Sequence, residues 1–409
     1  MQALILAGGM GTRLRSILPD LPKPLAPIGT KPFLLYILEQ LKKYGIKEVI
    51  ISVCYKADRI REVIGDGADI GLHVQYAIEE KPLGTGGALW NALPLFQEDS
   101  ILVINGDTYF DINYQILKKY HGLWKAELTL ALKYRENISR YGIVCLSRPS
   151  PHAEDNNHSP EWGGLYRVTL FHERPQADEV FGYINGGVYL INKDVVECLP
   201  RAPLSAERDI IPNLITHGVV YGLPMGGRFI DIGIPEDYRF AGENMQVWVR
   251  NTKYISLFLD RDGVINEDIG YLCRSKDVRF IPLTIEKIRL ANRLGWKVCV
   301  VSNQAGVARG YYQEEDIRLL HQWMSETLEK LDAHIDRFYY CPHHSQGSIA
   351  AYKKSCLCRK PEPGLFLKAA EELDLILEKS VMVGDQPTDL IRLPYLTSRH
   401  INDIDDIIK

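Results

Sequence analysis

A short stretch in the second half of the chain, residues 255–266 (ISLFLDRDGVIN), constrains the fold most strongly. It has the pattern of a buried strand that ends in two carboxylates and a glycine. Asp260 and Asp262 are two residues apart, so they point the same way while the backbone stays extended. Such a strand is typical of the opening of a domain, although it begins well inside the sequence. We therefore predict that a complete domain precedes it.

Length and composition agree with two domains and limit the partners. A chain of 409 residues is too long for one ordinary core, and 46% hydrophobic with 24% charged residues is typical of globular proteins. A net charge of −4 gives no reason to expect nucleic acid or an anionic membrane as partner. No apolar run approaches the roughly 18 residues of a membrane helix. Scattered cysteines and the absence of a signal-peptide pattern at residues 1–9 lead us to expect a cytoplasmic protein.

The N-terminal residues combine a strand with a glycine-rich loop. Residues 3–7 form a short apolar run, and residues 8–14 (GGMGTRL) follow at once. Glycines let backbone N–H groups approach a phosphate closely, and Arg13 can add a charged fork. Lys23 lies between two prolines, which stiffen its backbone and suit its ammonium to a second phosphate. A tight turn and an ordinary surface lysine are the alternatives to phosphate binding.

Helical and strand patterns then alternate, which predicts an α/β fold with a mostly parallel, doubly wound sheet. The expected elements are a helix at 32–44, a strand at 49–53, a helix at 57–64 and a strand at 74–77. Residues 80–87 (EKPLGTGG) form a second glycine-rich loop, suited to a flat or phosphorylated ligand.

Two aspartates follow strands in this first half. Asp107 comes directly after the apolar run 101–105, and Asp231 lies in the similar stretch 229–233 (FIDIG). The carboxyl ends of strands are where open α/β sheets bind ligands, and two aspartates there could hold Mg²⁺. Either aspartate alone is more often a turn residue or a helix cap.

Four motifs together resemble the sugar-1-phosphate nucleotidyltransferases over essentially the whole first half. They are LAGGMGTRL at 6–14, the Pro-Lys-Pro around Lys23, NGD at 105–107 and FIDIGIPED at 229–237. Within that family, KPLGTGG at 81–87 and GYINGG at 182–187 are most similar to the heptose-1-phosphate guanylyltransferases.

This resemblance implies a role for each matching residue. The nucleoside triphosphate would be held by Gly8, Gly9, Gly11, Thr12 and Arg13, with Lys23 near the α-phosphate and Gly86 beside the base. The sugar would be faced by Glu173, Asn185 and Gly186, and Mg²⁺ would be bound by Asp107 and Asp231.

The domain boundaries follow from the same patterns. We expect a nucleotidyltransferase domain at 1–240, a terminal helix with a short linker at 241–254, and a second domain at 255–409. Residues 149–161 are polar and contain prolines, so we expect a surface insertion there.

The two carboxylates that open the second domain suggest phosphoryl chemistry. A carboxylate such as Asp260 is ionised at neutral pH and can attack phosphorus without a base. Asp262 can protonate the departing oxygen and then activate water. Both need a cation, because carboxylate and phosphate repel each other. A calcium-loop fragment is the alternative, but the acidic ligand at its twelfth position is missing.

Three later stretches complete a pattern that resembles the haloacid-dehalogenase (HAD) type phosphatases. They are VCVVSNQ at 298–304, RKPEPG at 359–364 and VMVGDQPTD at 381–389. The resemblance implies that Asp260 is the nucleophile and Asp262 the general acid/base, and that the phosphoryl group is held by Ser302 and Lys360. Mg²⁺ would be bound by Asp260, Asp385 and the backbone carbonyl of Asp262.

Residues 341–358 contain two closely spaced pairs of metal-ligating residues. Cys341, His343, Cys356 and Cys358 offer three thiolates and an imidazole, a closed tetrahedral set for structural Zn²⁺. The loop between the pairs lacks apolar periodicity, so the metal would have to organise it. Free cysteines are the alternative, and His344 could replace His343 as the ligand.

This loop, with DRDGVIN at 260–266, GVARGY at 306–311 and CRKP at 358–361, is similar to the heptose bisphosphate phosphatases. The similarity implies that Arg359 recognises a second phosphate and that Asn303 and Arg309 contact the substrate. Histidinol-phosphate phosphatases share these motifs and are the main alternative.

Together the halves predict two consecutive steps of nucleotide-activated heptose synthesis. The phosphatase would remove the 7-phosphate of heptose 1,7-bisphosphate, and the transferase would couple the 1-phosphate to a nucleotide from GTP. Mannose, glucose or amino-sugar 1-phosphates are alternative substrates of the first half, and a non-catalytic nucleotide-sugar sensor is the alternative of another class.

Overall fold

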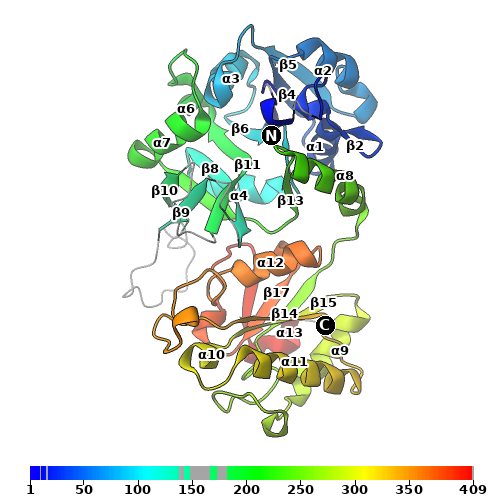
Figure 1. Ribbon diagram of the computed structural model, residues 1–409, viewed down its shortest axis with the longest axis vertical. Coiled ribbons are helices and arrows are strands. Elements are labelled where there is room, and N and C mark those ends of the chain that lie inside the picture. Colours follow the sequence, from blue (N-terminus) through cyan, green and yellow to red (C-terminus); the bar gives the residue numbers. More distant parts are fainter. Residues whose placement is uncertain are drawn as a thin grey trace. The chain divides into compact units, whose positions relative to one another are not determined.

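The computed structural model describes residues 1–9, 11–14, 17–136, 138, 142–147, 166–172 and 182–407. The expected insertion at 149–161 and the sugar-facing Glu173 lie outside the described residues, as does the side chain of Thr12. The chain divides into two compact units, Met1–Arg250 and Asn251–Lys409, each with its own sheet (Figure 1).

A mixed nine-stranded sheet forms the centre of the first unit. Its parallel part runs β5-β4-β1-β6, and β11 then joins β6 in the antiparallel direction. The strands are β1 (Gln2–Leu6), β4 (Glu48–Val53), β5 (His73–Ile78), β6 (Ser100–Asn105), β8 (Leu128–Arg135), β9 (Ile143–Leu146), β10 (Val168–His172), β11 (Gly182–Asn192) and β12 (Val220–Pro224). Two small ribbons join β2 (Pro27–Ile28) to β3 (Lys31–Pro32), and β7 (Thr108–Phe110) to β13 (Phe229–Asp231).

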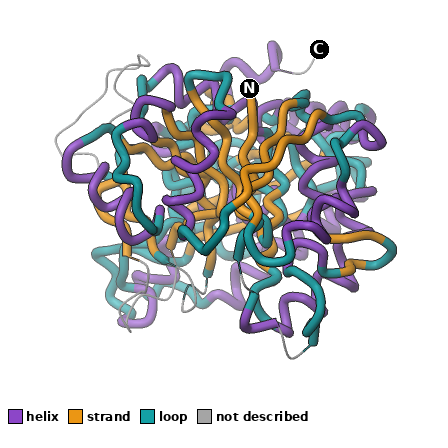
Figure 2. Tube along the Cα trace, turned by 90° about the horizontal axis from the view of Figure 1, so that it is seen from above, coloured by secondary structure: helices purple, strands orange, loops and turns teal. Residues whose placement is uncertain are grey.

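In Figure 2 the strands gather toward the middle of the picture and the helices lie mostly around them. Those of the first unit are α1 (Phe33–Lys43), α2 (Ala57–Ile64), α3 (Gly84–Ala92), α4 (Tyr114–Leu123), α6 (Lys193–Glu197), α7 (Ile211–His217) and α8 (Pro235–Arg250). Because helices cover the sheet, the middle residues of its central parallel strands are apolar, as in the fully buried Ala3, Leu4 and Ile5 of β1.

The second unit contains a five-stranded sheet in the order β16-β15-β14-β17-β18, and every strand pair in it is parallel. Its strands are β14 (Ser256–Leu259), β15 (Lys297–Asn303), β16 (Arg337–Cys341), β17 (Val381–Gly384) and β18 (Thr397–His400). Its helices are α9 (Pro282–Arg293), α10 (Ala305–Arg309), α11 (Glu314–Glu329), α12 (Gly364–Glu372) and α13 (Ile404–Ile407). The predicted α/β class is confirmed, with a wholly parallel sheet in the second unit. The first sheet is mixed rather than mostly parallel, because β11 pairs in the antiparallel direction with β6, β8 and β9.

Each sheet changes the direction of its strand order at its first strand. In the first unit β1 lies between β4 and β6, and in the second β14 lies between β15 and β17. Open α/β sheets bind ligands at such switch points, outside the carboxyl ends of the strands. The glycine-rich loop and Asp107 follow β1 and β6, while Asp260 and Asp385 follow β14 and β17. Among the described helices, none combines the length and the apolar character needed to span a bilayer.

Candidate active sites at two switch points

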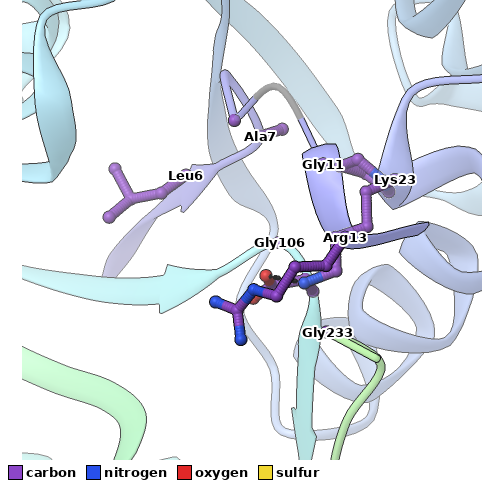
Figure 3. A pocket seen from close by; sticks show the side chains of 10 residues that line it. Leu6, Ala7, Gly11, Arg13, Lys23, Gly106 and Gly233 are labelled. Carbon is purple, nitrogen blue, oxygen red and sulfur yellow. Dashed lines mark hydrogen bonds and ion pairs between the residues drawn. The ribbon is translucent and has the colours of Figure 1, made fainter. Parts of the chain in front are cut away.

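A hollow of about 180 Å³ opens at the switch point of the first unit (Figure 3). Its lining comes from the strand ends of β1 and β6, the glycine-rich loop, the Pro-Lys-Pro turn and a glycine two residues after β13. The lining residues are Leu6, Ala7, Gly9, Gly11, Arg13, Lys23, Pro24, Gly106, Asp107 and Gly233. Gly8 lies next to it, where a Cβ would meet Glu79 Oε1 at 3.2 Å. The structure thus brings together the predicted phosphate-binding residues whose side chains it describes.

The glycine-rich loop closes against the lysine of the Pro-Lys-Pro turn. Gly11 has a φ of +56° and lies so close to Lys23 that a Cβ there would approach the lysine Cβ to 3.1 Å. Leu14 donates its N–H to the Gly11 carbonyl, which begins the short helical turn that carries Arg13. The Arg13 side chain extends from this turn past Gly106 in Figure 3. Two cationic groups therefore flank the hollow.

Lys23 lies between the two aspartates predicted to hold Mg²⁺. Its ammonium forms an ion pair with Asp107 and lies 3.6 Å from Asp231 Oδ1. The β7–β13 ribbon places the aspartates together, because Ile232 donates its N–H to the Asp107 carbonyl at 3.0 Å. Partial burial and the Asp107 carboxylate raise the pKa of Asp231 to about 6, although Lys23 opposes the rise. The crowded negative charge fits an additional cation.

Tight packing explains the glycines of the second glycine-rich loop. Gly86 lies inside α3, its N–H donates to the Leu204 carbonyl at 2.9 Å, and a Cβ there would meet Ile210 at 2.6 Å. Glu79, buried just before this loop, accepts hydrogen bonds from Ser52 Oγ at 2.7 Å and from the Leu83 N–H at 3.0 Å. The predicted contact of Gly86 with a base stays a prediction, whereas its packing role is visible.

Asn185 and Gly186 lie where β11 bulges beside the strand end that carries Asp107. The register of β11 against β8 shifts between Asn185 and Tyr189. A Cβ on Gly186 would meet the Phe110 ring at 2.6 Å, and one on Gly187 would meet Asn105 Nδ2 at 3.1 Å. The close approaches leave little room for a side chain at either glycine, and the bulge lies beside Asn105 and Thr108, the neighbours of the strand end that carries Asp107. Asn185 and Gly186 themselves do not line the hollow.

In the second unit, a lysine again lies between two aspartates. Lys360 Nζ is 2.9 Å from Asp260 Oδ2 and 2.6 Å from Asp389 Oδ1, and all three residues are buried. Asp260 Oδ1 also accepts the Arg261 N–H at 2.7 Å. Burial raises the pKa of Asp260 to about 6, and Asp389 adds to the rise while Lys360 opposes it. The carboxylate is thus desolvated but charge-balanced.

Asp385 completes a group of carboxylates that could hold a metal ion. One oxygen each of Asp260, Asp385 and Asp389 lies within 4.8 Å of the others. Asp385 Oδ1 is buried and has no hydrogen-bond partner among the described residues. Gly263, with a φ of +79°, leaves room for this carboxylate, since a Cβ there would lie 2.3 Å from Asp385 Oδ2. An unpartnered buried oxygen among three carboxylates fits a hard cation such as Mg²⁺.

Asp262 is held apart from that group by four donors. Arg261, which is fully buried, donates from Nε to Asp262 Oδ1 at 3.0 Å and from a terminal nitrogen to Oδ2 at 2.7 Å. Asn266 Nδ2 donates to Oδ1 at 3.0 Å and Gln304 Nε2 to Oδ2 at 3.2 Å. The side chain of Asp262 is therefore not part of the carboxylate cluster, which leaves its backbone carbonyl as the predicted metal ligand.

Ser302 and Asn303 end β15 beside these groups. Ser302 is buried and its Oγ accepts from Gln304 Nε2 at 2.7 Å. The Asn303 side chain both donates to the Lys360 carbonyl at 3.1 Å and accepts the Lys360 N–H at 3.0 Å. Asn303 thus fixes the backbone of Lys360, and the substrate contact expected for it stays a prediction.

Cys341, His343, Cys356 and Cys358 meet in one cluster. The three Sγ atoms lie 3.1–3.5 Å apart, and His343 Nδ1 is 3.3 Å from Cys358 Sγ and 3.7 Å from Cys341 Sγ. Zn–S bonds of about 2.3 Å in a tetrahedron would separate the sulfurs by about 3.8 Å. The cluster therefore fits a tetrahedral metal ion after a small expansion.

The comparisons with known proteins assign the two units. The nucleotidyl transferase family model matches residues 2–246. The chain belongs to the nucleotidyl transferase family. A D-glycero-alpha-D-manno-heptose 1-phosphate guanylyltransferase of Aneurinibacillus thermoaerophilus is 41% identical over 250 residues, which are 61% of this chain and all of that protein. The crystal structure of HddC from Yersinia pseudotuberculosis is 34% identical, with a TM-score of 0.51 over 60% of this chain and 99% of HddC.

The second unit has relatives of its own. The HAD-hydrolase-like family model matches residues 357–391. A D-glycero-beta-D-manno-heptose-1,7-bisphosphate 7-phosphatase of Haemophilus influenzae is 42% identical over 135 residues, which are 33% of this chain and 73% of that protein. The chain is thus an enzyme that fuses a nucleotidyltransferase with a member of the heptose bisphosphate phosphatase family, as predicted.

Arg359 and His344 are neighbours of the clustered metal-ligating residues of the phosphatase unit. Arg359 donates to the His343 carbonyl at 3.3 Å. Burial lowers the pKa of His344, and the nearby guanidinium groups of Arg359 and Arg309 lower it further. His344 Nδ1 accepts the Gln346 N–H at 3.1 Å, and His344 is not among the clustered ligands. The structure favours His343 over His344 as the metal ligand.

Sequence reasoning assigned no role to three residues of the phosphatase site. Arg261 and Gln304 hold Asp262, and Asp389 pairs with Lys360. Arg261 could have been noticed, because a charged residue between two inward carboxylates of a buried strand end needs a buried partner. The partners of Gln304 and Asp389 depend on tertiary contacts with no local signal in the sequence.

Proposed function

We propose that this chain catalyses two consecutive steps of nucleotide-activated heptose synthesis. The phosphatase unit removes the 7-phosphate of D-glycero-D-manno-heptose 1,7-bisphosphate, and the nucleotidyltransferase unit then joins heptose 1-phosphate to a nucleotide and releases pyrophosphate. One observation carries the proposal: relatives of both units are named for phosphates of D-glycero-D-manno-heptose, and removal of the 7-phosphate from a heptose 1,7-bisphosphate leaves a heptose 1-phosphate, the kind of substrate for which the transferase relatives are named.

The phosphatase step begins with Asp260 as the nucleophile. Its carboxylate needs no base to attack phosphorus, and burial leaves it poorly solvated and reactive. Lys360 and Ser302 bind the transferred phosphoryl group. Asp262 protonates the departing sugar oxygen and afterwards takes a proton from the water that hydrolyses the aspartyl phosphate.

The transferase step needs no nucleophile from the protein, because the sugar phosphate is itself one. The glycine-rich loop and Arg13 bind the triphosphate, and Lys23 neutralises charge near the α-phosphate. Asn185 and Gly186 face the sugar from the β11 bulge, and Glu173 joins them. In-line positioning and charge stabilisation supply the rate.

Two metals complete the proposal. Mg²⁺ would be held by Asp107 and Asp231 in the first unit, and by Asp260, Asp385 and the Asp262 carbonyl in the second. When bound, it screens phosphate charge and polarises the reacting phosphoryl group. Zn²⁺ at Cys341, His343, Cys356 and Cys358 would organise the loop that carries Arg359.

We propose that the transferase unit binds a guanine nucleotide and that the Glu79 carboxylate recognises the base by hydrogen bonds. The Glu79 carboxylate lies between the two glycine-rich loops, 3.2 Å from a Cβ built on Gly8 and 3.0 Å from the Leu83 nitrogen. Of the four bases, guanine alone offers two adjacent donors, N1–H and N2–H, that suit a carboxylate. HddC has been crystallised with GMP-PN, which supports the proposal.

We propose the α anomer for both steps. The transferase relatives are named for the alpha sugar and the phosphatase relatives for the beta sugar. Removal of a phosphate at C7 leaves C1 unchanged, so one anomer must serve both reactions. The transferase forms its bond through the C1 phosphate and therefore decides the anomer.

The proposal assigns the transferase to residues 1–240, the terminal helix and linker to 241–254 and the phosphatase to 255–409. The eight cysteines are free, and a thiolate cluster requires reduced sulfur, so we place the enzyme in the cytoplasm.

The deciding experiment supplies heptose 1,7-bisphosphate of each anomer with Mg²⁺ and each nucleoside triphosphate, and follows phosphate and pyrophosphate. We expect phosphate release followed by GTP-dependent pyrophosphate release with the α anomer. Phosphate without pyrophosphate would redirect the transferase to mannose, glucose or amino-sugar 1-phosphates. No release of either would contradict the heptose assignment and make histidinol phosphate the next substrate.

A further inference from the structure

The connection between β17 and β18 differs from the other connections of the phosphatase sheet. The connections that lead to β15, β16 and β17 each contain an α-helix: α9, then α10 with α11, then α12. The connection from β17 to β18 is residues 385–396, all of which the structure describes, and its only regular element is the short 3-10 helix Pro387–Asp389. Parallel strands are usually joined through an α-helix that covers the sheet. Here a short strap, residues 386–396, takes the place of that helix.

Buried apolar side chains hold the strap in place. Ile391, Leu393 and Leu396 are buried. Ile391 also donates its N–H to Ser398 Oγ in β18 at 3.2 Å. The strap is therefore packed against the unit, and a packed segment can hold its neighbours in a fixed position.

Three contacts join the strap to the loop that carries Lys360. Asp389 pairs with the Lys360 ammonium at 2.6 Å. The Arg392 N–H donates to the Pro361 carbonyl at 2.9 Å, and the Arg392 guanidinium donates to Glu362 Oε1 at 2.5 Å. The contacts fall on three consecutive residues of the loop. The strap thus holds both the ammonium of Lys360 and the backbone that follows it.

The strand β15 holds the Lys360 backbone as well, through the Asn303 side chain, which bonds both its N–H and its carbonyl. The Lys360 side chain keeps only 1% of its surface exposed, whereas Arg392 and Glu362 each keep 29%. A side chain in close-packed surroundings has no room to move, so the backbone that carries it sets its position. Because Glu362 is partly exposed, removing Arg392 does not leave a fully buried charge unpaired.

We propose that Arg392 is a positioning residue of the phosphatase reaction. By holding Pro361 and Glu362, it fixes the point at which the Lys360 ammonium meets the transferred phosphoryl group. A displaced ammonium stabilises the charge of the transition state less well, and this loss lowers kcat. The inference rests on the proposed phosphatase activity and adds to it a residue that does not itself touch the reacting atoms.

The test uses two substrates that share only the phosphoryl group, heptose 1,7-bisphosphate and p-nitrophenyl phosphate. We expect Arg392→Ala in the full chain to lower kcat about tenfold with both substrates and to change KM by less than about twofold, because Lys360 binds the group that both substrates have. Arg392→Lys keeps a cation within reach of Glu362 and should retain about half of kcat or more. Arg318→Ala removes a surface guanidinium paired with Glu315 on α11 and is the control, with both rates unchanged.

A double-mutant cycle tests whether Arg392 acts through Glu362. Arg392→Ala combined with Glu362→Ala should lower kcat no further than Glu362→Ala alone, because both changes remove the same contact. A general loss of folding would instead add the two effects and would not be repaired by Arg392→Lys. Additive losses would therefore contradict the proposal.

Other results would also overturn the positioning role. An unchanged kcat in Arg392→Ala would show that the strap does not position Lys360. A loss with the bisphosphate alone, or a higher KM with an unchanged kcat, would show that Arg392 contacts another part of the substrate. A wild type that hydrolyses p-nitrophenyl phosphate but not the bisphosphate would refute the proposed substrate, and the p-nitrophenyl phosphate rates would still decide the role of Arg392. A wild type that hydrolyses neither would refute the phosphatase and the positioning role together.

Discussion

The two switch points have the same architecture but differ in exposure. In both, the first strand lies between the second and a later strand, and a lysine bridges two aspartates at the strand ends. In the transferase unit Asp107 and Asp231 each keep 34% of their side-chain surface exposed. In the phosphatase unit Asp260 keeps 11% and Asp389 4%.

This difference follows the chemistry proposed for each site. A carboxylate that attacks phosphorus must be fixed and poorly solvated, which the phosphatase achieves by burying it against a buried lysine. A site whose substrate brings its own nucleophile must instead admit two large anions, and an open hollow lined by backbone and cations suits that task. The same strand order therefore supports both reactions, and the residues at the strand ends decide between them.

The largest expected effect comes from removing the proposed nucleophile. Asp260→Asn keeps the size of the side chain but lacks the charge that attacks phosphorus, so phosphate release should fall by about 10⁴-fold or more. Pyrophosphate release from supplied heptose 1-phosphate should remain within about twofold, because that site uses no protein carboxylate as nucleophile.

Asp405→Asn is the matched control for this variant, because Asp405 is an exposed aspartate of the same unit, 71% exposed and paired only across the surface with Lys287. It should leave both rates unchanged. Phosphatase turnover that survives Asp260→Asn would show that the two sites do not differ in the source of their nucleophile.

The reciprocal change is Lys23→Met, which removes the ammonium between Asp107 and Asp231. We expect pyrophosphate release to fall by roughly 10²–10³-fold, the usual cost of losing one group that stabilises transition-state charge. Phosphate release should be unaffected. Lys31→Met removes a surface lysine paired with Glu39 in the same unit and should change neither rate. Equal losses in Lys31→Met and Lys23→Met would reduce Lys23 to a structural residue.

The Cys356→Ser variant tests whether the phosphatase unit needs a bound metal to fold. We expect no such need in the transferase unit. The variant should lose about one equivalent of zinc by elemental analysis and roughly 3 kcal/mol of stability in the second unit. Cys299→Ser also destabilises that unit, because it buries a hydroxyl in β15, but it should keep the zinc. If Cys356→Ser retained its zinc, the cluster would not be a closed site.

Sequence patterns predict the candidate site residues that lie within a single short motif. They do not predict the residues that loops bring together from different parts of the chain. Asp260, Asp262, Lys360 and the cysteine pairs stand in short motifs whose spacing limits their geometry. The choice of His343 over His344 needed the structure, because both are within reach along the chain.

The missed residues share a physical cause. Gln304 and Asp389 act through partners that are distant in the sequence, Asp262 for Gln304 and Lys360 for Asp389. Arg261 holds the neighbouring Asp262, but it is itself held by the Leu272 carbonyl, eleven residues away. Gly86 also packs against Leu204 and Ile210, a contact that the sequence does not indicate, and its predicted contact with a base stays a prediction. The sequence shows that a glycine-rich loop has few side chains. It does not show whether a ligand or another part of the protein occupies the space that they leave.

The smallest expected effect concerns base choice, which has no counterpart in the phosphatase. Glu79→Gln replaces a double acceptor by one acceptor and one donor, a pair that suits adenine better than guanine. The ratio of kcat/KM for GTP to that for ATP should fall about tenfold, which corresponds to roughly 1.4 kcal/mol. Glutamine can still accept from Ser52 or Leu83, so the loop should keep its shape. Glu48→Gln, at an exposed glutamate paired with His73, is the control. If the ratio of kcat/KM for GTP to that for ATP did not change and GTP turnover stayed normal, Glu79 would only connect the two loops structurally. Backbone groups would then select the base.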